Sequence, residues 1–178
     1  LFMNDIGYYS YFEDENLQVL AKPYKDSNIK MYFALPKNNE QIRVSALENA
    51  MSQTESKYVR LKLPKFKTEY LHENLIDILK DLGVNAAFSP SKANFWSMYN
   101  KRPDGGENIF IGLILQKTFI EVDEKGTEAA AATVIGMETT SIRPSDPIAF
   151  ECDKPFAYFI RNDVTGDILF MGEYAFTE

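Results

Sequence analysis

The stretch that decides the fold is FIEVDEKGTEAAAAT, residues 119–133, in which a β-rich segment runs without a break into four consecutive alanines. Alanine is the strongest helix former, so Ala129–Ala132 taken alone favours a helix. Its neighbours favour a strand, because Val134, Ile135 and nearby threonines follow. Composition alone leaves both interpretations open.

Taken as a strand, this segment has two different faces, because successive side chains alternate between the two sides. Glu128 and Glu138 fall on one face. The other face carries no charge and consists of Thr127, Ala129, Ala131, Thr133, Ile135, Met137 and Thr139. Such a face could enter an existing sheet without burying an unpaired ion, which would be costly.

The segments on either side also favour β structure. In the first half of Ile109–Val122 the apolar residues are continuous and do not alternate with polar ones, which is typical of a central strand with both faces covered. Before it, Ser89–Asn108 has few periodic apolar residues and is expected to be a long surface loop that carries Trp96. After it, Phe156–Arg161 and Asp167–Tyr174 flank five turn-forming residues and predict a hairpin.

The first half of the chain predicts a mixture of strands and helices. Three short strand candidates separated by turn-forming residues suggest an antiparallel meander. Two amphipathic stretches predict helices, the second of which ends at Gly83. The expected strands are Tyr8–Phe12, Leu17–Tyr24, Ile29–Leu35 and Tyr58–Leu63, and the expected helices are Glu40–Ser52 and Leu71–Leu82. The sum is an α+β fold.

Composition argues against two classes of partner. The 178 residues carry a net charge of −7, whereas binding to nucleic acid or to an anionic membrane needs a basic surface. The apolar run Ile109–Leu115 is too short to span a bilayer. Leu1–Ile6 does not resemble a signal peptide, and we expect the natural N-terminus to lie upstream.

Candidate catalytic and metal-binding residues do not form a known pattern. Cys152 is the single cysteine, so it can form no internal disulfide, and we expect a small buried hydrophobe. His72 is the single histidine and is expected to be solvated at a helix start. Asp14, Asp26 and Asp104 lack a second acid at ligand spacing. We therefore expect no catalytic residues, no metal and no cofactor: the chain is not predicted to be an enzyme.

Residues 119–133 resemble the hinge signature of the serpin family, in which Gly-Thr-Glu and a run of alanines follow an acidic strand end. DKPFAYFIR at 153–161 and DILFMG at 167–172 resemble the family's C-terminal strand pair, and LQVLAKPY, MYFALP and LPKF resemble its earlier segments in the same order. The resemblance implies an incomplete serpin domain over 1–178, the C-terminal half of a mixed and antiparallel multi-sheet fold. It places a hinge and exposed reactive loop at 124–150. The hinge residues are Glu124, Gly126, Thr127, Glu128, Ala129, Ala130, Ala131, Ala132 and Thr133.

The resemblance also implies a function. Serpins inhibit serine proteases by suicide cleavage of the loop and insertion of the hinge as a new strand. The family's spacing from the hinge glycine implies a reactive bond at Thr140–Ser141, with Met137 as the alternative. No Lys or Arg lies between Gly126 and Ser141, so the expected target is elastase-like or chymotrypsin-like and not trypsin-like. The alternatives are a non-inhibitory serpin and a truncated serpin fragment without inhibitory activity.

Two departures from the family pattern bear on these expectations. Serpins are about twice as long as this chain, and the missing part would include strands that flank the insertion slot. Gln116 stands before Lys117 where the family usually has His, although Gln can still donate and accept hydrogen bonds. An extracellular location is the family default and an intracellular one is the alternative.

Overall fold

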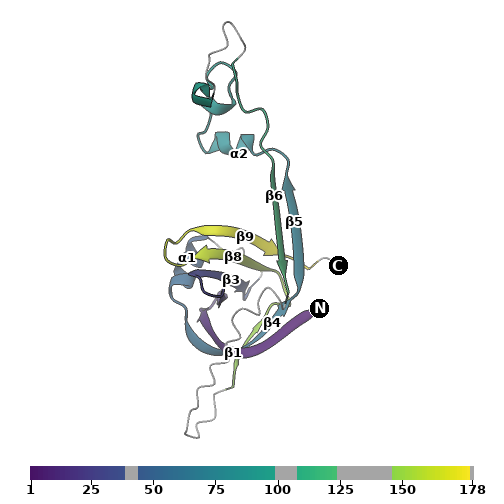
Figure 1. Cartoon of the computed structure of the whole chain (residues 1–178). Helices are drawn as coiled ribbons and strands as arrows, with labels where there is room; N and C mark the ends of the chain where they lie inside the picture. The colour runs from purple at the N-terminus through teal and green to yellow at the C-terminus, as the bar shows by residue number, and fades with distance from the viewer. Residues whose placement is uncertain (39–43, 99–107, 124–145, 177–178) are drawn as a thin grey trace. The chain divides into compact units, whose positions relative to one another are not determined.

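A computed structural model describes residues 1–38, 44–98, 108–123 and 146–176. The chain divides into two compact units (Figure 1). The first unit consists of Leu1–Phe66 and Glu121–Glu178, and the second of Lys67–Ile120. The mixed α+β class expected from the sequence is confirmed.

A seven-stranded sheet forms the first unit, in the spatial order β7-β4-β1-β2-β3-β8-β9. Its pairs are antiparallel except for β4 and β7, which run parallel. The strands are β1 (Phe2–Glu13), β2 (Leu17–Pro23), β3 (Ile29–Pro36), β4 (Glu55–Pro64), β7 (Ile148–Glu151), β8 (Phe156–Asn162) and β9 (Ile168–Tyr174).

The expected meander is confirmed, since β1, β2 and β3 pair in succession as antiparallel neighbours. The first turn depends on Asp14, whose carboxylate accepts hydrogen bonds from the backbone N–H groups of Asn16 and Leu17, each at 2.8 Å. Aspartate favours this local arrangement, and it ends β1 at the acidic stretch that the sequence indicates. At the second turn, Asp26 adopts a positive φ of 53°.

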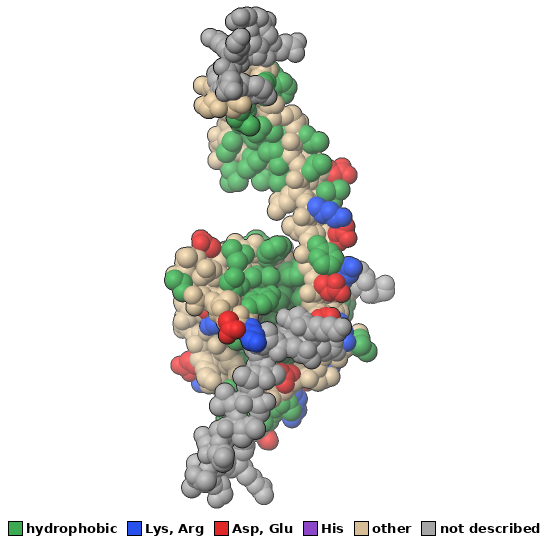
Figure 2. Space-filling view, viewed as in Figure 1, with side chains coloured by type: hydrophobic (Ala, Val, Ile, Leu, Met, Phe, Trp, Pro, Cys, Tyr) green, Lys and Arg blue, Asp and Glu red, His purple; other side chains and the backbone are tan. Residues whose placement is uncertain are grey.

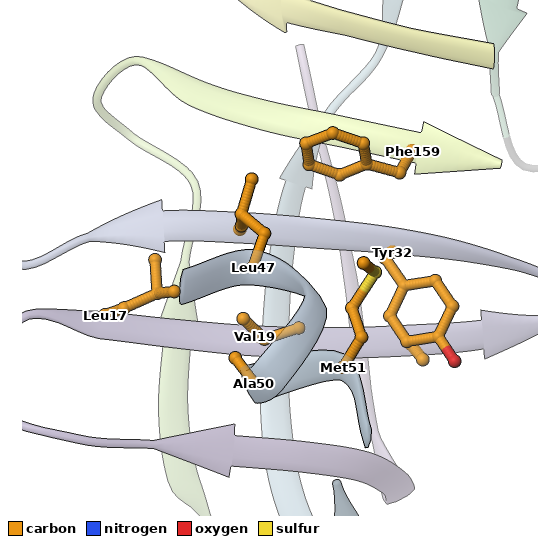
Figure 3. Packing of buried hydrophobic residues seen from close by; sticks show 9 residues of the cluster. Leu17, Val19, Tyr32, Leu47, Ala50, Met51 and Phe159 are labelled. Carbon is orange, nitrogen blue, oxygen red and sulfur yellow. The ribbon is translucent and has the colours of Figure 1, made fainter. Parts of the chain in front are cut away.

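Helix α1 (Val44–Ser52) packs on one face of the sheet (Figure 3). Its buried residues Leu47, Ala50 and Met51 lie over β2, β3 and β8 and belong to one hydrophobic cluster. The strand residues of that cluster alternate along each strand, as the two-residue period of a strand requires. They are Leu17, Val19, Ala21, Tyr32, Ala34 and Phe159. The helical spacing predicted that the three helix residues share an apolar face with Ala46, but Ala46 is exposed. The predicted start at Glu40 lies outside the described residues.

The strand residues that alternate with those under α1 include large aromatic side chains. Phe66 contacts the rings of Phe156, Tyr158 and Tyr174 at centroid distances of 5.8, 5.3 and 4.9 Å. Phe33 lies edge-on to Phe156 at 6.1 Å. Burial of these large rings makes the β8–β9 hairpin part of the core.

The end strand β9 leaves apolar side chains at the surface. Leu169, Phe170 and Met171 are 50%, 43% and 57% exposed. Figure 2 shows hydrophobic side chains gathered on the surface of the first unit where β9 lies.

The hairpin between β8 and β9 is confirmed. Gly166 adopts φ 81°, a conformation that costs glycine little, and its N–H donates to the Asn162 carbonyl at 2.8 Å. Asp163 fixes the turn to β3, because its carboxylate pairs with Lys30 at 2.7 Å and accepts the Tyr32 hydroxyl hydrogen bond at 2.7 Å. Arg161 also lies 3.4 Å from the Asp163 carboxylate.

In the second unit, the helix predicted at Leu71–Leu82 is shorter than expected. Helix α2 (Ile76–Asp81) begins after Asn74, whose side chain accepts the Ile76 N–H at 3.0 Å. The preceding residues form β5 (Phe66–His72), so Leu71 lies in a strand. Gly83 ends the helix as predicted, with φ 95° and its N–H donating to the Lys80 carbonyl at 2.9 Å.

The long strand predicted at Ile109–Val122 is only partly correct. Strand β6 (Gln116–Val122) covers its second half and pairs with β5 in a two-stranded sheet. The first half makes irregular bonds, such as Ile111 N–H to the Ala87 carbonyl at 3.0 Å and Leu75 N–H to the Ile114 carbonyl at 3.1 Å. The expectation of two covered faces was wrong for the described residues, since Leu113 and Leu115 are exposed.

The stretch predicted as one long loop, Ser89–Asn108, contains the short 3-10 turn Trp96–Met98, and another turn, Ala86–Phe88, precedes it. Asn108, at the end of this stretch, donates its side-chain N–H to the Ala93 carbonyl at 2.7 Å. The rest, residues 99–107, lies outside the described part of the chain and includes Asp104 and the Gly105-Gly106 pair.

Candidate functional site

The candidate site is the segment between β6 and β7. Residues 124–145 lie outside the described part of the chain. This range contains the whole predicted hinge from Glu124 to Thr133, the predicted reactive bond Thr140–Ser141 and the alternative Met137. The structure therefore tests none of these assignments, and we describe the two strands that flank the segment.

The N-terminal flank is β6, which runs antiparallel to β5 (Figure 1). Side chains join the two strands: Lys117 forms an ion pair with Glu69, and the Thr118 hydroxyl donates to the Tyr70 carbonyl at 3.4 Å. The Lys67 ammonium lies 5.0 Å from the centre of the Phe119 ring. The hydrogen bond from Lys117 lowers the pKa of the exposed Glu69 carboxyl. Gln116, which the resemblance places where the family usually has His, is exposed at the start of the strand.

Within the two-stranded sheet, β6 has a partner on one edge only among the described residues. An unpaired edge presents backbone N–H and C=O groups that can accept a further strand. Phe119 is 49% exposed on this strand. The strand that precedes the predicted hinge is therefore able to take another neighbour.

The C-terminal flank is β7, a short strand that sequence reasoning missed. Its four residues pair in parallel with β4, with Val59 opposite Ile148 and Leu61 opposite Phe150. Phe150 is fully buried, and its ring lies edge-on to Tyr11 at 6.3 Å. The alternation of Ile148 and Phe150 was the available signal, but four residues are too few to distinguish a strand from a loop.

The next residue, Cys152, extends this attachment, since its N–H donates to the Lys62 carbonyl at 2.8 Å. Cys152 is fully buried, which confirms the prediction of a small core residue. Burial raises the pKa of the thiol, so it stays protonated and is a poor nucleophile.

The other candidate polar residues do not form a catalytic group in the described part of the chain. His72 is half-buried at the end of β5, not at a helix start, because the helix begins later than predicted. Its ring lies 6.2 Å from that of Tyr70. Asp14 and Asp26 lie in turns, as expected. No group of three or more His, Cys, Asp or Glu side chains suited to a metal occurs among the described residues.

The family model described as "Serpin (serine protease inhibitor)" matches residues 1–176. This chain belongs to the serpin family. Serpins mostly inhibit proteases and are generally not enzymes. None of the described helices is long and apolar enough to span a membrane.

Two relatives illustrate the similarity. An uncharacterized serpin-like protein of Thermococcus kodakarensis is 35% identical over 177 residues, which cover 96% of this chain and 40% of that serpin. The human leukocyte elastase inhibitor is 34% identical over 180 residues, which cover 94% of this chain and 45% of that inhibitor.

Solved serpin structures share the fold. The thermophilic serpin tengpin in its native state matches with a TM-score of 0.75 and 31% identity, over 99% of this chain and 46% of tengpin. Native protease nexin-1, solved with heparin, matches with a TM-score of 0.75 and 30% identity, over 99% of this chain and 47% of that protein. The chain thus spans less than half the length of these relatives.

Proposed function

We propose that this chain carries the reactive-loop part of a serine-type endopeptidase inhibitor. The observation that carries the proposal is the hinge sequence at 124–133, found in a chain that belongs to the serpin family. The hinge combines Gly126 with four alanines, and the face that begins at Thr127 has no charged residue. Small uncharged side chains are what a strand needs in order to enter a closed sheet.

The proposed reaction begins at Thr140. The protease serine attacks its carbonyl carbon, the Thr140–Ser141 amide bond breaks, and the amine of Ser141 leaves with a proton. An ester then joins Thr140 to the protease. Insertion of the freed hinge carries the bound protease along the sheet and distorts its active site before water hydrolyses the ester. The chain supplies the bond that the protease cleaves and the strand that inserts, so we assign no catalytic role to any of its residues.

The residues around Thr140 support the proposed choice of target. A protease pocket with an acid at its base needs a basic residue before the cut bond, and leaving that acid unpaired is costly. The sequence from Gly126 to Ser141 contains none, and Arg143 precedes Pro144, a bond that trypsin-like enzymes cleave poorly. Thr140 fits the small pocket of an elastase-like protease, and Met137 would fit a chymotrypsin-like one.

A covalent complex tests the function. The full-length gene product is incubated with elastase, chymotrypsin and trypsin, and each mixture is run on a denaturing gel. We expect a complex that resists denaturation with elastase or chymotrypsin and none with trypsin. Cleaved product without any complex would instead identify a non-inhibitory serpin that is merely a substrate.

The second candidate is a serpin fragment without inhibitory activity. It is favoured by the single partner of β6 among the described residues. Sequencing the gene upstream of Leu1 distinguishes the two, because only an inhibitor needs the strands of the other half of the fold.

A further inference from the structure

Strand β7 is held by more than its neighbour β4. It is the end strand of the seven-stranded sheet, and only four residue pairs join it to β4. A second attachment comes from Gln18 on β2, whose side-chain N–H group donates to the Ala149 carbonyl at 3.2 Å. The same Nε2 donates to the Tyr11 hydroxyl at 2.8 Å. Gln18 therefore bridges β7 and the β1–β2 hairpin.

The bridge continues into a chain of hydrogen bonds with consistent directions. The Tyr11 hydroxyl donates to Glu13 Oε2 at 2.8 Å, and Glu13 Oε1 pairs with Lys37 Nζ at 2.6 Å. Burial and the bond to Glu13 raise the pKa of Tyr11, so its hydroxyl remains a donor. The bonds from Lys37 and Tyr11 lower the pKa of Glu13, which remains an acceptor. A chain of aligned bonds strengthens each member.

Two further contacts join the same regions. The Tyr11 ring lies edge-on to Phe150, the buried residue in the middle of β7. Beyond β7, the Lys154 ammonium donates to the Lys37 carbonyl at 3.2 Å. The segment 149–154 is thus attached at three points to residues that belong to, or directly follow, β1, β2 and β3.

We propose that Gln18 is a positioning residue for the segment 124–145, because it anchors the strand into which the C-terminal end of that segment continues. A loop whose C-terminal end is held in a sheet loses less conformational freedom when a protease binds it. The value of this anchor for inhibition rests on the proposed function, whereas the anchor itself does not.

Hydrogen exchange of the whole chain tests the anchor. In Gln18→Ala, the peptide that covers 146–153 should exchange about three- to ten-fold faster, the effect of losing one or two hydrogen bonds, while peptides from β3 and β8 keep their rates. Gln18→Glu has almost the same size but cannot donate, so it should show the same acceleration. Gln53→Ala is the matched control, because the Gln53 side chain donates to that of Asn49 on α1 and takes no part in the bridge to β7.

Three results would overturn the proposal: an unchanged β7 peptide in both Gln18 variants, wild-type protection in Gln18→Glu, or equal acceleration in every strand. If Gln18→Ala does not fold, Tyr11→Phe decides the question, because it keeps the ring against Phe150 and removes the hydroxyl. It too should accelerate exchange at β7. If the full-length gene product shows the anchor but forms no complex with any protease, only the proposed function is refuted.

Discussion

The close approach of β8 to β9 at Gly172 gives the sharpest prediction about the fold. Gly172 lies opposite Tyr158 in the antiparallel ladder, and a Cβ atom built on it would overlap the Tyr158 hydroxyl and the ring carbon that bears it. Tyr158 is buried, and its ring packs against Phe66 at 5.3 Å, so it has little room to move. Gly172→Ala should therefore destabilise the first unit.

The magnitude follows from two opposing effects. Forcing an extra methyl group into a packed site costs about 1–3 kcal/mol. Gly172 does not adopt a positive φ, so alanine meets no backbone strain there, and replacing glycine in a strand returns about 0.5–1 kcal/mol. Taken from the middle of each range, the net expectation is a loss of about 1 kcal/mol in the free energy of unfolding.

The assay is urea unfolding of the whole chain followed by far-ultraviolet circular dichroism. Gly7→Ala on β1 is the matched control, because the nearest atom to its new Cβ would be Tyr9 Cε2 at 3.7 Å, an ordinary contact. It should leave stability unchanged or slightly raised. In a Tyr158→Ala background, Gly172→Ala should become neutral or stabilising, since the obstructing ring is gone.

Two results would refute this reasoning. One is equal stability of Gly172→Ala and Gly7→Ala, which would mean that the packing of Tyr158 over Gly172 is wrong. The other is the same cost for Gly172→Ala with and without the Tyr158 side chain, which would assign the loss to the backbone of β9 and not to the contact.

Three further predictions concern the loop and the hairpin. The isolated polypeptide 1–178 should inhibit neither elastase nor chymotrypsin. The inserted hinge needs a neighbouring strand on each of its two edges, and among the described residues the free edge of β6 supplies only one of them. Stoichiometric inhibition would disprove this. In the full-length gene product, Thr127→Arg should convert inhibitor to substrate while Glu128→Arg is tolerated on the other face. If the two variants consume equal numbers of inhibitor molecules per inactivated protease, the assignment of Thr127 and Glu128 to opposite faces is wrong. Asp163→Asn should reduce the loss of unfolding free energy that occurs as the pH falls. Burial opposes ionisation of Asp163, but the bonds from Lys30 and Tyr32 outweigh it and lower the Asp163 pKa. A lowered pKa in the folded state gives stability that is present above the ordinary aspartate pKa and is lost as the pH falls through the folded value. Urea unfolding between about pH 6 and pH 2 measures this loss. The same dependence on pH in Asp163→Asn and in the unchanged chain would contradict the role of Asp163.

The β-rich parts of the chain could be predicted because local signals mark them. Turn-forming residues separate β1, β2 and β3, and another turn after Asn162 separates β8 from β9. Leu47 and Met51 have helical spacing within the predicted helix, and both are buried in the core. Local sequence is informative where a turn and an alternating strand agree.

Elements that depend on distant partners could not be predicted in this way. Leu71 and Leu75 have helical spacing, yet Leu71 lies in β5, because pairing with β6 outweighs the local pattern. The strand β7 depends on β4, which lies far away in the sequence. The anchor at Gln18 joins residues 131 positions apart, and no local pattern reveals such a contact. The reactive bond rests on the family resemblance and remains a prediction.

The most direct test of the central claim is the mass of the peptide released when the full-length gene product reacts with elastase. Suicide cleavage at Thr140–Ser141 predicts a C-terminal peptide that begins at Ser141, together with a protease-bound remainder that resists denaturation. A peptide that begins at Glu138 would move the reactive bond to Met137 and favour a chymotrypsin-like target. A peptide that begins at Pro144, or cleavage without any bound protease, would contradict the account.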